Sequence, residues 1–162
     1  MSAPVFTQTL AVAGVILEKD GKILLAQEAR GLDKGKWNHP AGLIDVGEDP
    51  VTAARREVLE ETGYHFEPTR LLGVYSFMRK YKDPSISVTP HAIKLIYTGR
   101  ILNDGRQKLE ADIATTEWFT PEEIYAMDST TLRDEDIKQM IRDYLSGKAI
   151  GLDALTHTEW EV

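Results

Sequence analysis

Two apolar runs near the N-terminus predict a pair of strands. They cover Leu10–Leu17 and Lys22–Gln27, and the chain passes between them through Asp20-Gly21, a dipeptide typical of tight hairpin turns. The next segment, Glu28–Lys36, is rich in charged residues and glycine, and we expect it to form a loop. The pattern therefore begins with β structure.

The clearest helix signal follows this loop. Asp49 can cap the first turn, Pro50 fits the first helical position and Gly63 can end the helix in a left-handed conformation. These signals predict a helix over Pro50–Thr62. Its narrow apolar stripe, spaced for one helix face, consists of Val51, Ala54 and Val58.

The second half of the chain mixes strands, turns and helices. Strands are expected at Leu71–Phe77, Pro90–Ile101 and around Glu117–Phe119, with a turn at Asn103-Asp104-Gly105. A helix should follow the capping box of Thr120 and Glu123 around Pro121, and a last helix should span Glu135–Leu145. Interleaved strands and helices, together with a hairpin, predict an α/β fold with helices packed on a mixed sheet.

Length and charge narrow the classes of function. The 162 residues suit one domain spanning residues 1–162. The net charge of −7 disfavours a nucleic-acid partner, which normally requires a basic face, but it permits a phosphorylated small molecule. There is no apolar run long enough to cross a membrane, no signal-peptide pattern and no cysteine, so we expect a cytoplasmic protein without disulfides or thiolate chemistry.

Three glutamates share one face of the first predicted helix. Glu57, Glu60 and Glu61 are spaced three and four residues apart, which brings their side chains together away from the apolar stripe. Like charges at this spacing destabilise a helix slightly, while Mg²⁺ prefers carboxylate oxygens shared with substrate phosphates. Taken alone, the cluster also fits an ordinary solvated acidic face.

The wider spacing decides between these interpretations. From Gly42 the chain has five residues, then Glu48, then seven residues, then Arg56-Glu57-Val58-Leu59-Glu60-Glu61-Thr62-Gly63-Tyr64. This resembles the Nudix signature G-x5-E-x7-R-E-U-x-E-E-x-G-U, in which U is aliphatic. Only Tyr64 departs from it, which affects packing and leaves the chemistry intact. The flanking segments Trp37–Gly42 and Glu117–Phe119 are also similar to that family.

The resemblance implies a Nudix-type α/β/α sandwich around a mixed sheet, here with an extra C-terminal helix. It implies Glu57, Glu60 and Glu61 as metal ligands and catalytic residues, with the carbonyl oxygen of Gly42 as a further ligand. Glu48 and Arg56 would form a supporting ion pair. The cofactor would be Mg²⁺, with Mn²⁺ as a substitute, and water would attack phosphorus. The resemblance leaves the identity of the general base open.

Other polar residues are weaker candidates. Glu110 and Asp112 precede the late strand, where similar proteins often hold a further acidic ligand. Arg30, Lys34 and Lys36 precede the signature and are candidates for contacts with phosphate oxygens. Trp37 and Tyr75 are candidates for stacking on a base, although core or rim packing is the commoner use of such residues. For the charged residues, solvated loop positions are the competing interpretation, and the spacing of His39 and His91 suggests no metal pair.

The function implied is hydrolysis of a phosphoanhydride bond in a small nucleoside di- or triphosphate or a related pyrophosphate. The ending, from Thr131-Leu132-Arg133 to Ser146-Gly147-Lys148, is similar to that of small bacterial Nudix tri- and diphosphatases. One alternative is a nucleotide-sugar pyrophosphatase of the ADP-ribose type; another, disfavoured by the acidic charge, acts on the 5′ end of RNA. A third is a non-catalytic nucleotide sensor, which the intact glutamates disfavour. An isomerase of the isopentenyl diphosphate type is disfavoured because the similar enzymes of that type use a cysteine and this chain has none. A homodimer is compatible with the sequence.

Overall fold

A computed structural model describes residues 9–80, 82–83, 91–103 and 108–161. Its centre is a mixed four-stranded sheet in the order β5 (Ala41–Leu43), β1 (Thr9–Ile16), β7 (His91–Ile101) and β6 (Phe66–Met78). Strands β1 and β7 run parallel, whereas β1 with β5 and β6 with β7 are antiparallel. The predicted mixed sheet is therefore confirmed.

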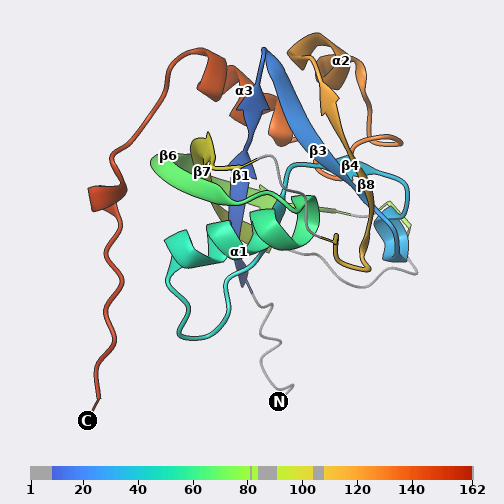
Figure 1. Ribbon diagram of the computed structural model, residues 1–162. Helices are drawn as coiled ribbons and strands as arrows, with labels where there is room; N and C mark the ends of the chain where they lie inside the picture. Colours follow the sequence, from blue (N-terminus) through green and yellow to red (C-terminus); the bar gives the residue numbers. More distant parts are fainter. Residues whose placement is uncertain (1–8, 81, 84–90, 104–107, 162) are drawn as a thin grey trace, which may run out of the picture.

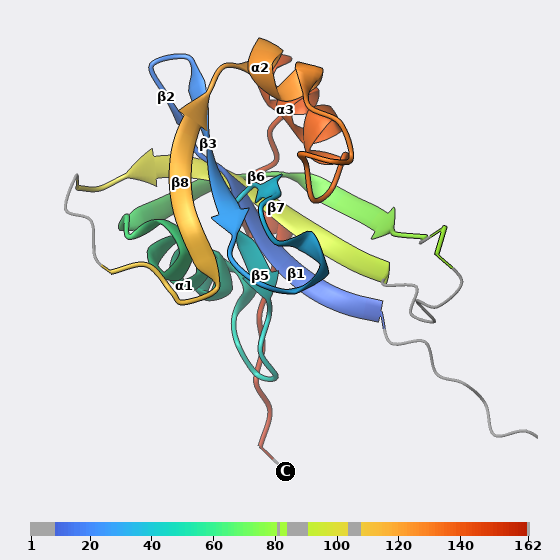
Figure 2. The same cartoon turned by 90° about the vertical axis from the view of Figure 1, so that its right-hand side faces the viewer.

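A second, antiparallel sheet lies beside the first. It is formed by β2 (Glu18–Lys19), β3 (Lys22–Glu28), β4 (Trp37–Asn38) and β8 (Ile113–Phe119), with β3 paired to each of the other three. Figure 2 shows β3 and β8 side by side, crossing the direction of the central strands. The strands are thus divided between two sheets.

The expected pairing of the first two apolar runs is wrong. The Asp20-Gly21 turn does have the left-handed backbone of a tight hairpin, with φ of 54° and 77°. However, it joins β3 to the short strand β2, while β1 ends at Ile16 and pairs with β5 and β7. The physical reason is burial: β1 is covered on both faces, so its partners come from the central sheet.

Helices cover both faces of the central sheet. Helix α1 (Pro50–Thr62) lies on one face, while α2 (Pro121–Ala126) and α3 (Ile137–Leu145) lie together on the other (Figure 1). Short 3-10 turns occur at Gly31–Asp33, inside the predicted loop, and at Leu152–Ala154. This is the expected α/β/α arrangement with an additional helix near the C-terminus.

The predicted ends of α1 are confirmed. The Asp49 carboxylate accepts a hydrogen bond from the Thr52 backbone N–H at 2.9 Å, Pro50 begins the helix and Gly63 follows it with a φ of 74°. The helix packs its buried face on the sheet through Ala53, Ala54 and Val58. Local capping therefore fixes where this helix begins. Ala54 and Val58 of the predicted stripe are buried, but Glu57, which was expected away from the stripe, is buried as well.

Two apolar clusters lie on opposite sides of the central sheet. One contains the buried face of α1 with Val15 and Leu17, and the other contains Ile16 with α2 and α3 residues such as Ile124 and Met140. Successive residues of β1 thus supply both clusters, as the alternation of a strand requires.

Several elements differ in length from the sequence prediction. Strand β6 begins at Phe66, earlier than predicted; register irregularities at Pro68/Arg70 and Leu71/Gly73 interrupt the alternation that would have revealed its first residues. Strand β8 also begins earlier, at Ile113. Helix α3 begins at Ile137 instead of the predicted Glu135. The described part of β7 begins at His91; the predicted Pro90 and most of the predicted turn after Asn103 lie outside the described residues. Among the described helices, none is long and apolar enough to span a membrane.

Candidate active site

Arg56 organises the acidic face of α1. Its guanidinium donates to both carboxylate oxygens of Glu48, at 2.8 and 2.9 Å, to Glu57 at 2.6 Å and to Glu60 at 3.1 Å. It also donates to the carbonyl of Leu43 at 2.9 Å, which attaches the loop before the helix. The Glu48–Arg56 ion pair expected from the sequence is present, and it is bidentate, the strongest form of such a pair. Its hydrogen bonds lower the pKa of Glu48.

Glu57 lies against the backbone of Gly42. The side chain is buried, and a Cβ added at Gly42 would lie well within 3.0 Å of its carboxyl group. Burial raises the pKa of Glu57, while its hydrogen bond from Arg56 opposes this shift. Glycine is therefore required at position 42 for this carboxylate to sit beside the loop backbone.

Glu61 is held at the same place, one helical turn later. Its carboxylate accepts a hydrogen bond from the backbone N–H of Ala41 at 3.0 Å. Burial raises the pKa of Glu61 well above its ordinary value, and the nearby carboxylates of Glu57 and Glu28 add to this. A buried carboxylate among other carboxylates is stabilised in its charged form by a cation.

The residues present fit a hard divalent cation in their chemistry. The carboxylates of Glu57 and Glu61 both lie against β5, at Gly42 and Ala41, so carboxylate oxygens from two residues come from one small region. They are not gathered into a finished cluster: in the described parts of the chain, no three histidine, aspartate or glutamate side chains converge as metal ligands. In this structure Arg56 instead neutralises Glu48, Glu57 and Glu60.

The weaker candidates are distributed differently. Glu110 is brought to α1, since its N–H donates to the Glu60 carbonyl at 2.9 Å, and burial together with the charge of Glu60 raises the pKa of Glu110. Asp112 and Arg30 pair with each other at 3.1 Å in an exposed position. Lys36 lies 3.6 Å from Asp33, and Lys34 is exposed. Of these residues, Glu110 is the one that joins the glutamates.

The two aromatic candidates serve packing in the structure. Trp37 meets Phe119 edge to face, with ring centroids 4.9 Å apart, beside the apolar cluster under α2 and α3. Tyr75 packs against the same cluster and donates its hydroxyl to Asp143 at 2.7 Å. Burial and the Asp143 carboxylate raise the pKa of Tyr75. The packing interpretation of both residues therefore fits the structure.

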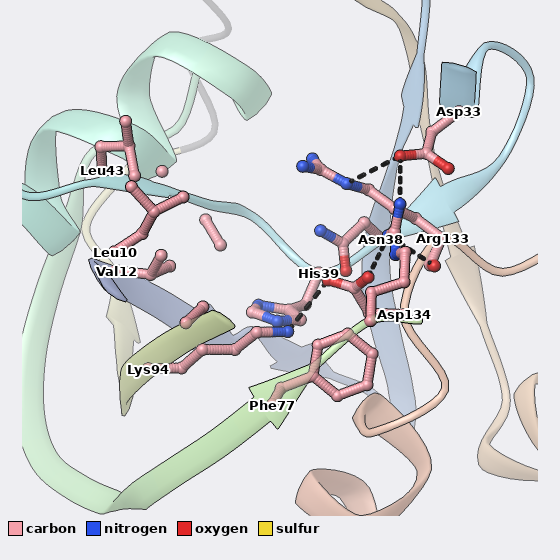
Figure 3. A pocket seen from close by; sticks show the side chains of 14 residues that line it. Leu10, Val12, Asp33, Asn38, His39, Leu43, Phe77, Lys94, Arg133 and Asp134 are labelled. Carbon is pink, nitrogen blue, oxygen red and sulfur yellow. Dashed lines mark hydrogen bonds and ion pairs between the residues drawn. The ribbon is translucent and has the colours of Figure 1, made fainter. Parts of the chain in front are cut away.

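A cavity of about 380 Å³ opens next to the glutamates. Ala41 and Gly42, which contact Glu61 and Glu57, form part of its wall. In Figure 3, Leu10, Val12 and Leu43 lie on one side of the cavity, and Asn38, Arg133 and Asp134 lie on the other. The site thus combines a carboxylate-rich edge with a cavity that has one apolar and one polar wall.

A chain of ion pairs builds the polar wall. Lys94, which is buried, contacts Asp134 at 2.9 Å and Asp136 at 3.0 Å. Arg79 contacts Asp134 and, at 2.7 Å, Asp33. Arg133 continues the chain from Asp33, at 3.5 Å, to Glu28 at 2.6 Å. The ion pairs with Lys94 and Arg79 lower the pKa of Asp134 to about 2, against the effect of its burial.

Apart from Gly42, sequence reasoning gave no functional role to the residues that line this cavity. Lys94 sits in β7 among apolar neighbours, and Asp134 lies in the segment before α3, so no spacing links them. His39 is buried, and burial with the nearby Lys94 charge lowers its pKa to about 3, so it is neutral at ordinary pH. One sequence feature could have indicated this wall: the polar residues Asn38 and His39 lie in a segment that is buried in the structure.

Comparison with known proteins finds relatives of one family. The NUDIX domain family model matches residues 7–144. Phosphatase NudJ of Escherichia coli K12 is 30% identical over 145 residues, which is 90% of this chain and 89% of that protein. A MutT-like protein of Streptomyces ambofaciens is 30% identical over 116 residues, covering 72% of this chain and 66% of that protein.

Solved structures agree with this result. A NUDIX hydrolase from Nitrosomonas europaea superposes with a TM-score of 0.74 at 33% identity, covering 93% of this chain and 98% of that one. The fold is also that of a MutT protein from Methanosarcina mazei, with a TM-score of 0.69 at 21% identity over 90% of this chain and 99% of that one. Together with the signature between Gly42 and Tyr64, these matches show that this chain belongs to the Nudix hydrolase family.

Proposed function

We propose that this protein hydrolyses a phosphoanhydride bond in a small di- or triphosphate, with Mg²⁺ held by the glutamates of α1. The observation that carries the proposal is the placement of Glu57 and Glu61 against Gly42 and Ala41, at the edge of a cavity. Phosphates bound over the carboxylates would leave the organic part of the substrate next to this cavity. The phosphatase and hydrolase relatives support the same reaction type.

In this proposal Glu57, Glu60 and Glu61 would hold the cation, with the Gly42 carbonyl as a further oxygen donor. The bound cation would neutralise phosphate oxygens and lower the pKa of a water molecule. Arg56 and Glu48 keep the loop and the helix in register, because one guanidinium contacts both of them. Glu110 lies beside Glu60 and would add a further carboxylate to this group.

The protein's own carboxylates would also accept the proton released by the attacking water. Burial raises the pKa of Glu57 and of Glu61, which makes each a stronger base than an exposed glutamate. The Ala41 N–H fixes the orientation of the Glu61 carboxylate. Both glutamates remain candidates for this role, and the Glu57→Gln and Glu61→Gln variants can be compared by their pH–rate profiles.

The test is hydrolysis by the purified protein with Mg²⁺ across a panel of phosphoanhydrides. The panel holds nucleoside di- and triphosphates, ADP-ribose, dinucleoside polyphosphates and small heterocyclic pyrophosphates, with products separated by chromatography. We expect Glu61→Gln to lose at least about 100-fold in kcat. Glu122→Gln, at an exposed glutamate of α2, is the matched control and should keep wild-type activity.

Each outcome of the panel has a distinct meaning. Turnover of di- or triphosphates that Glu61→Gln loses and Glu122→Gln keeps supports the proposal. Preferred cleavage of ADP-ribose would replace it by a nucleotide-sugar pyrophosphatase. Nucleotide binding without turnover of any compound would replace it by a non-catalytic nucleotide-binding module.

A further inference from the structure

Arg133 lines the cavity close to its carboxylate-rich edge. It comes from the segment between α2 and α3, and its backbone N–H is fixed by a hydrogen bond to the Trp37 carbonyl at 2.9 Å. Its side chain lies on the polar side of the cavity (Figure 3), and the same cavity is lined by Ala41, which holds the Glu61 carboxylate. A cation therefore stands at the boundary between the cavity and the proposed metal ligands.

Two carboxylates fix the guanidinium of Arg133 and leave one of its nitrogens without a partner. Nη1 donates to Glu28 at 2.6 Å, and Nε lies 3.5 Å from the Asp33 carboxylate. Within the described parts of the chain, Nη2 donates to no protein acceptor. Nε is enclosed, but Nη2 is not, and the side chain is 36% exposed. A ligand in the cavity can therefore reach this end of the guanidinium, whose N–H groups only donate.

The charge of Arg133 acts on the glutamate site. Burial is the main reason why the pKa of Glu61 is raised; among the nearby charges, Glu57 and Glu28 raise this pKa further and Arg133 lowers it. Arg133 nevertheless forms no ion pair with Glu61 in the described structure, since its ion-pair partners are Glu28 and Asp33. The guanidinium is thus close enough to influence Glu61 and is still available to another anion.

A phosphate chain is the anion that fits between the glutamates and Arg133. A cation bound by the glutamates and a guanidinium beside them repel each other unless negative oxygens lie between them. A diphosphate carries such oxygens on two neighbouring phosphorus atoms, so one group can face the metal while the other accepts from an arginine. Because Glu28 and Asp33 already hold the guanidinium, little side-chain freedom is lost when the ligand binds.

From these contacts we propose that Arg133 binds the phosphate chain of the substrate through Nη2, next to the phosphate held by the glutamate-bound cation. The proposal rests on the proposed function, since it adds a substrate-binding residue to the same site. Arg133 lies outside the signature between Gly42 and Tyr64, and the spacing of that signature gives no indication of it.

Methylenediphosphonate tests this contact without turnover, because it is a diphosphate analogue whose bridging carbon resists hydrolysis. Isothermal titration calorimetry with the full chain and Mg²⁺ should show binding to the wild type and about 10- to 150-fold weaker binding to Arg133→Gln, the range for a hydrogen bond to a charged group. Arg55→Gln is the matched control: it breaks an exposed ion pair with Glu67, at 2.8 Å, and should bind as the wild type does. Equal affinity in Arg133→Gln, or no binding by the wild type, would overturn the proposal.

Binding of the cation alone separates a lost substrate contact from a damaged site. Titration with Mn²⁺, followed by electron paramagnetic resonance, measures the glutamate site without any phosphate. Arg133→Gln should bind Mn²⁺ at least as tightly as the wild type, because the substitution removes a positive charge near Glu61. Weaker Mn²⁺ binding in this variant would mean that Arg133 supports the glutamates instead of the substrate, and it would contradict the proposal.

Nitrogen NMR on the unmodified protein covers the case in which Arg133→Gln fails to fold. When methylenediphosphonate binds with Mg²⁺, the guanidinium signals of Arg133 should shift and its Nη hydrogens should exchange more slowly, while those of Arg55 stay unchanged. Unmoved Arg133 signals with the analogue bound would refute the contact. Binding through Arg133 without hydrolysis of any phosphoanhydride would refute the proposed function alone, whereas hydrolysis with undiminished binding in Arg133→Gln would refute this inference alone.

Discussion

Replacing Gly42 by alanine tests how closely Glu57 is fitted to the loop. The added Cβ would lie well inside 3.0 Å of the Glu57 carboxyl group, whereas ordinary contacts begin at 3.4 Å. The carboxylate would have to move away, but it is buried and bonded to Arg56 at 2.6 Å. Movement therefore breaks a charged hydrogen bond or shifts the β5 backbone.

The expected cost follows from this geometry. Overpacking of a buried site costs about 1–3 kcal/mol in the free energy of unfolding. For a chain of this length each kcal/mol lowers Tm by roughly 2–4 °C, so Gly42→Ala should melt roughly 2–12 °C below the wild type. Since Glu57 is a proposed metal ligand, hydrolysis should fall as well.

A double-mutant cycle assigns the cause. If the clash with the Glu57 carboxyl group is responsible, Gly42→Ala should cost little in a Glu57→Ala background, and urea unfolding of all four proteins measures the coupling. An equal cost in both backgrounds would show that backbone conformation at position 42 matters instead. Wild-type stability and activity in Gly42→Ala would refute the proposed fit altogether.

Three further perturbations have defined outcomes. Asp49→Ala removes the cap on Thr52 and should lower the free energy of unfolding by about 1 kcal/mol; urea titration with an unchanged midpoint would contradict the cap. The pKa of His39 falls from 6.5 to about 3 on folding, so between these pH values the unfolded state binds a proton that the folded state does not. The free energy of unfolding should therefore be highest above pH 6.5 and fall as the pH decreases towards 3, by up to about 1.4 kcal/mol per pH unit. His39→Phe should make the free energy of unfolding less dependent on pH, and an identical pH dependence in the variant and the wild type would contradict this role of His39. Mg²⁺ at about 100 times its Kd should stabilise the protein by about 2.7 kcal/mol in a thermal melt, and no shift at millimolar Mg²⁺ would count against the glutamate site.

The helix and the loop that carry the glutamates could be predicted because their signals are local. Asp49, Pro50 and Gly63 specify the ends of α1 through contacts within a few residues. Arg56 lies on the same helix as the glutamates, and the structure contains its expected ion pair with Glu48 in the preceding loop. The roles of these residues in binding metal and in catalysis stay proposals.

Strand pairing was harder to predict because it depends on distant partners. The Asp20-Gly21 turn was identified correctly, but the strand on its N-terminal side is β2 instead of the long apolar run. An apolar run buried on both faces does not reveal which neighbour it will meet. In β6, the bulges near Pro68 and Leu71 interrupt the alternation that would have shown its full length.

The cavity shows most clearly what a family signature leaves out. The signature places the glutamates within about 20 consecutive residues, whereas Lys94 and Asp134 come from segments 40 positions apart and meet only in the fold. In the sequence, Lys94 and Asp134 each look like an ordinary charged residue. Only their buried ion pair, at 2.9 Å, shows that they belong to the same wall of the cavity. The position of the glutamates is therefore specified by local spacing, while the polar wall of the cavity is built from long-range contacts. This is the physical reason why one signature accompanies many substrates, and why substitutions in the cavity wall test specificity more directly than substitutions of the glutamates.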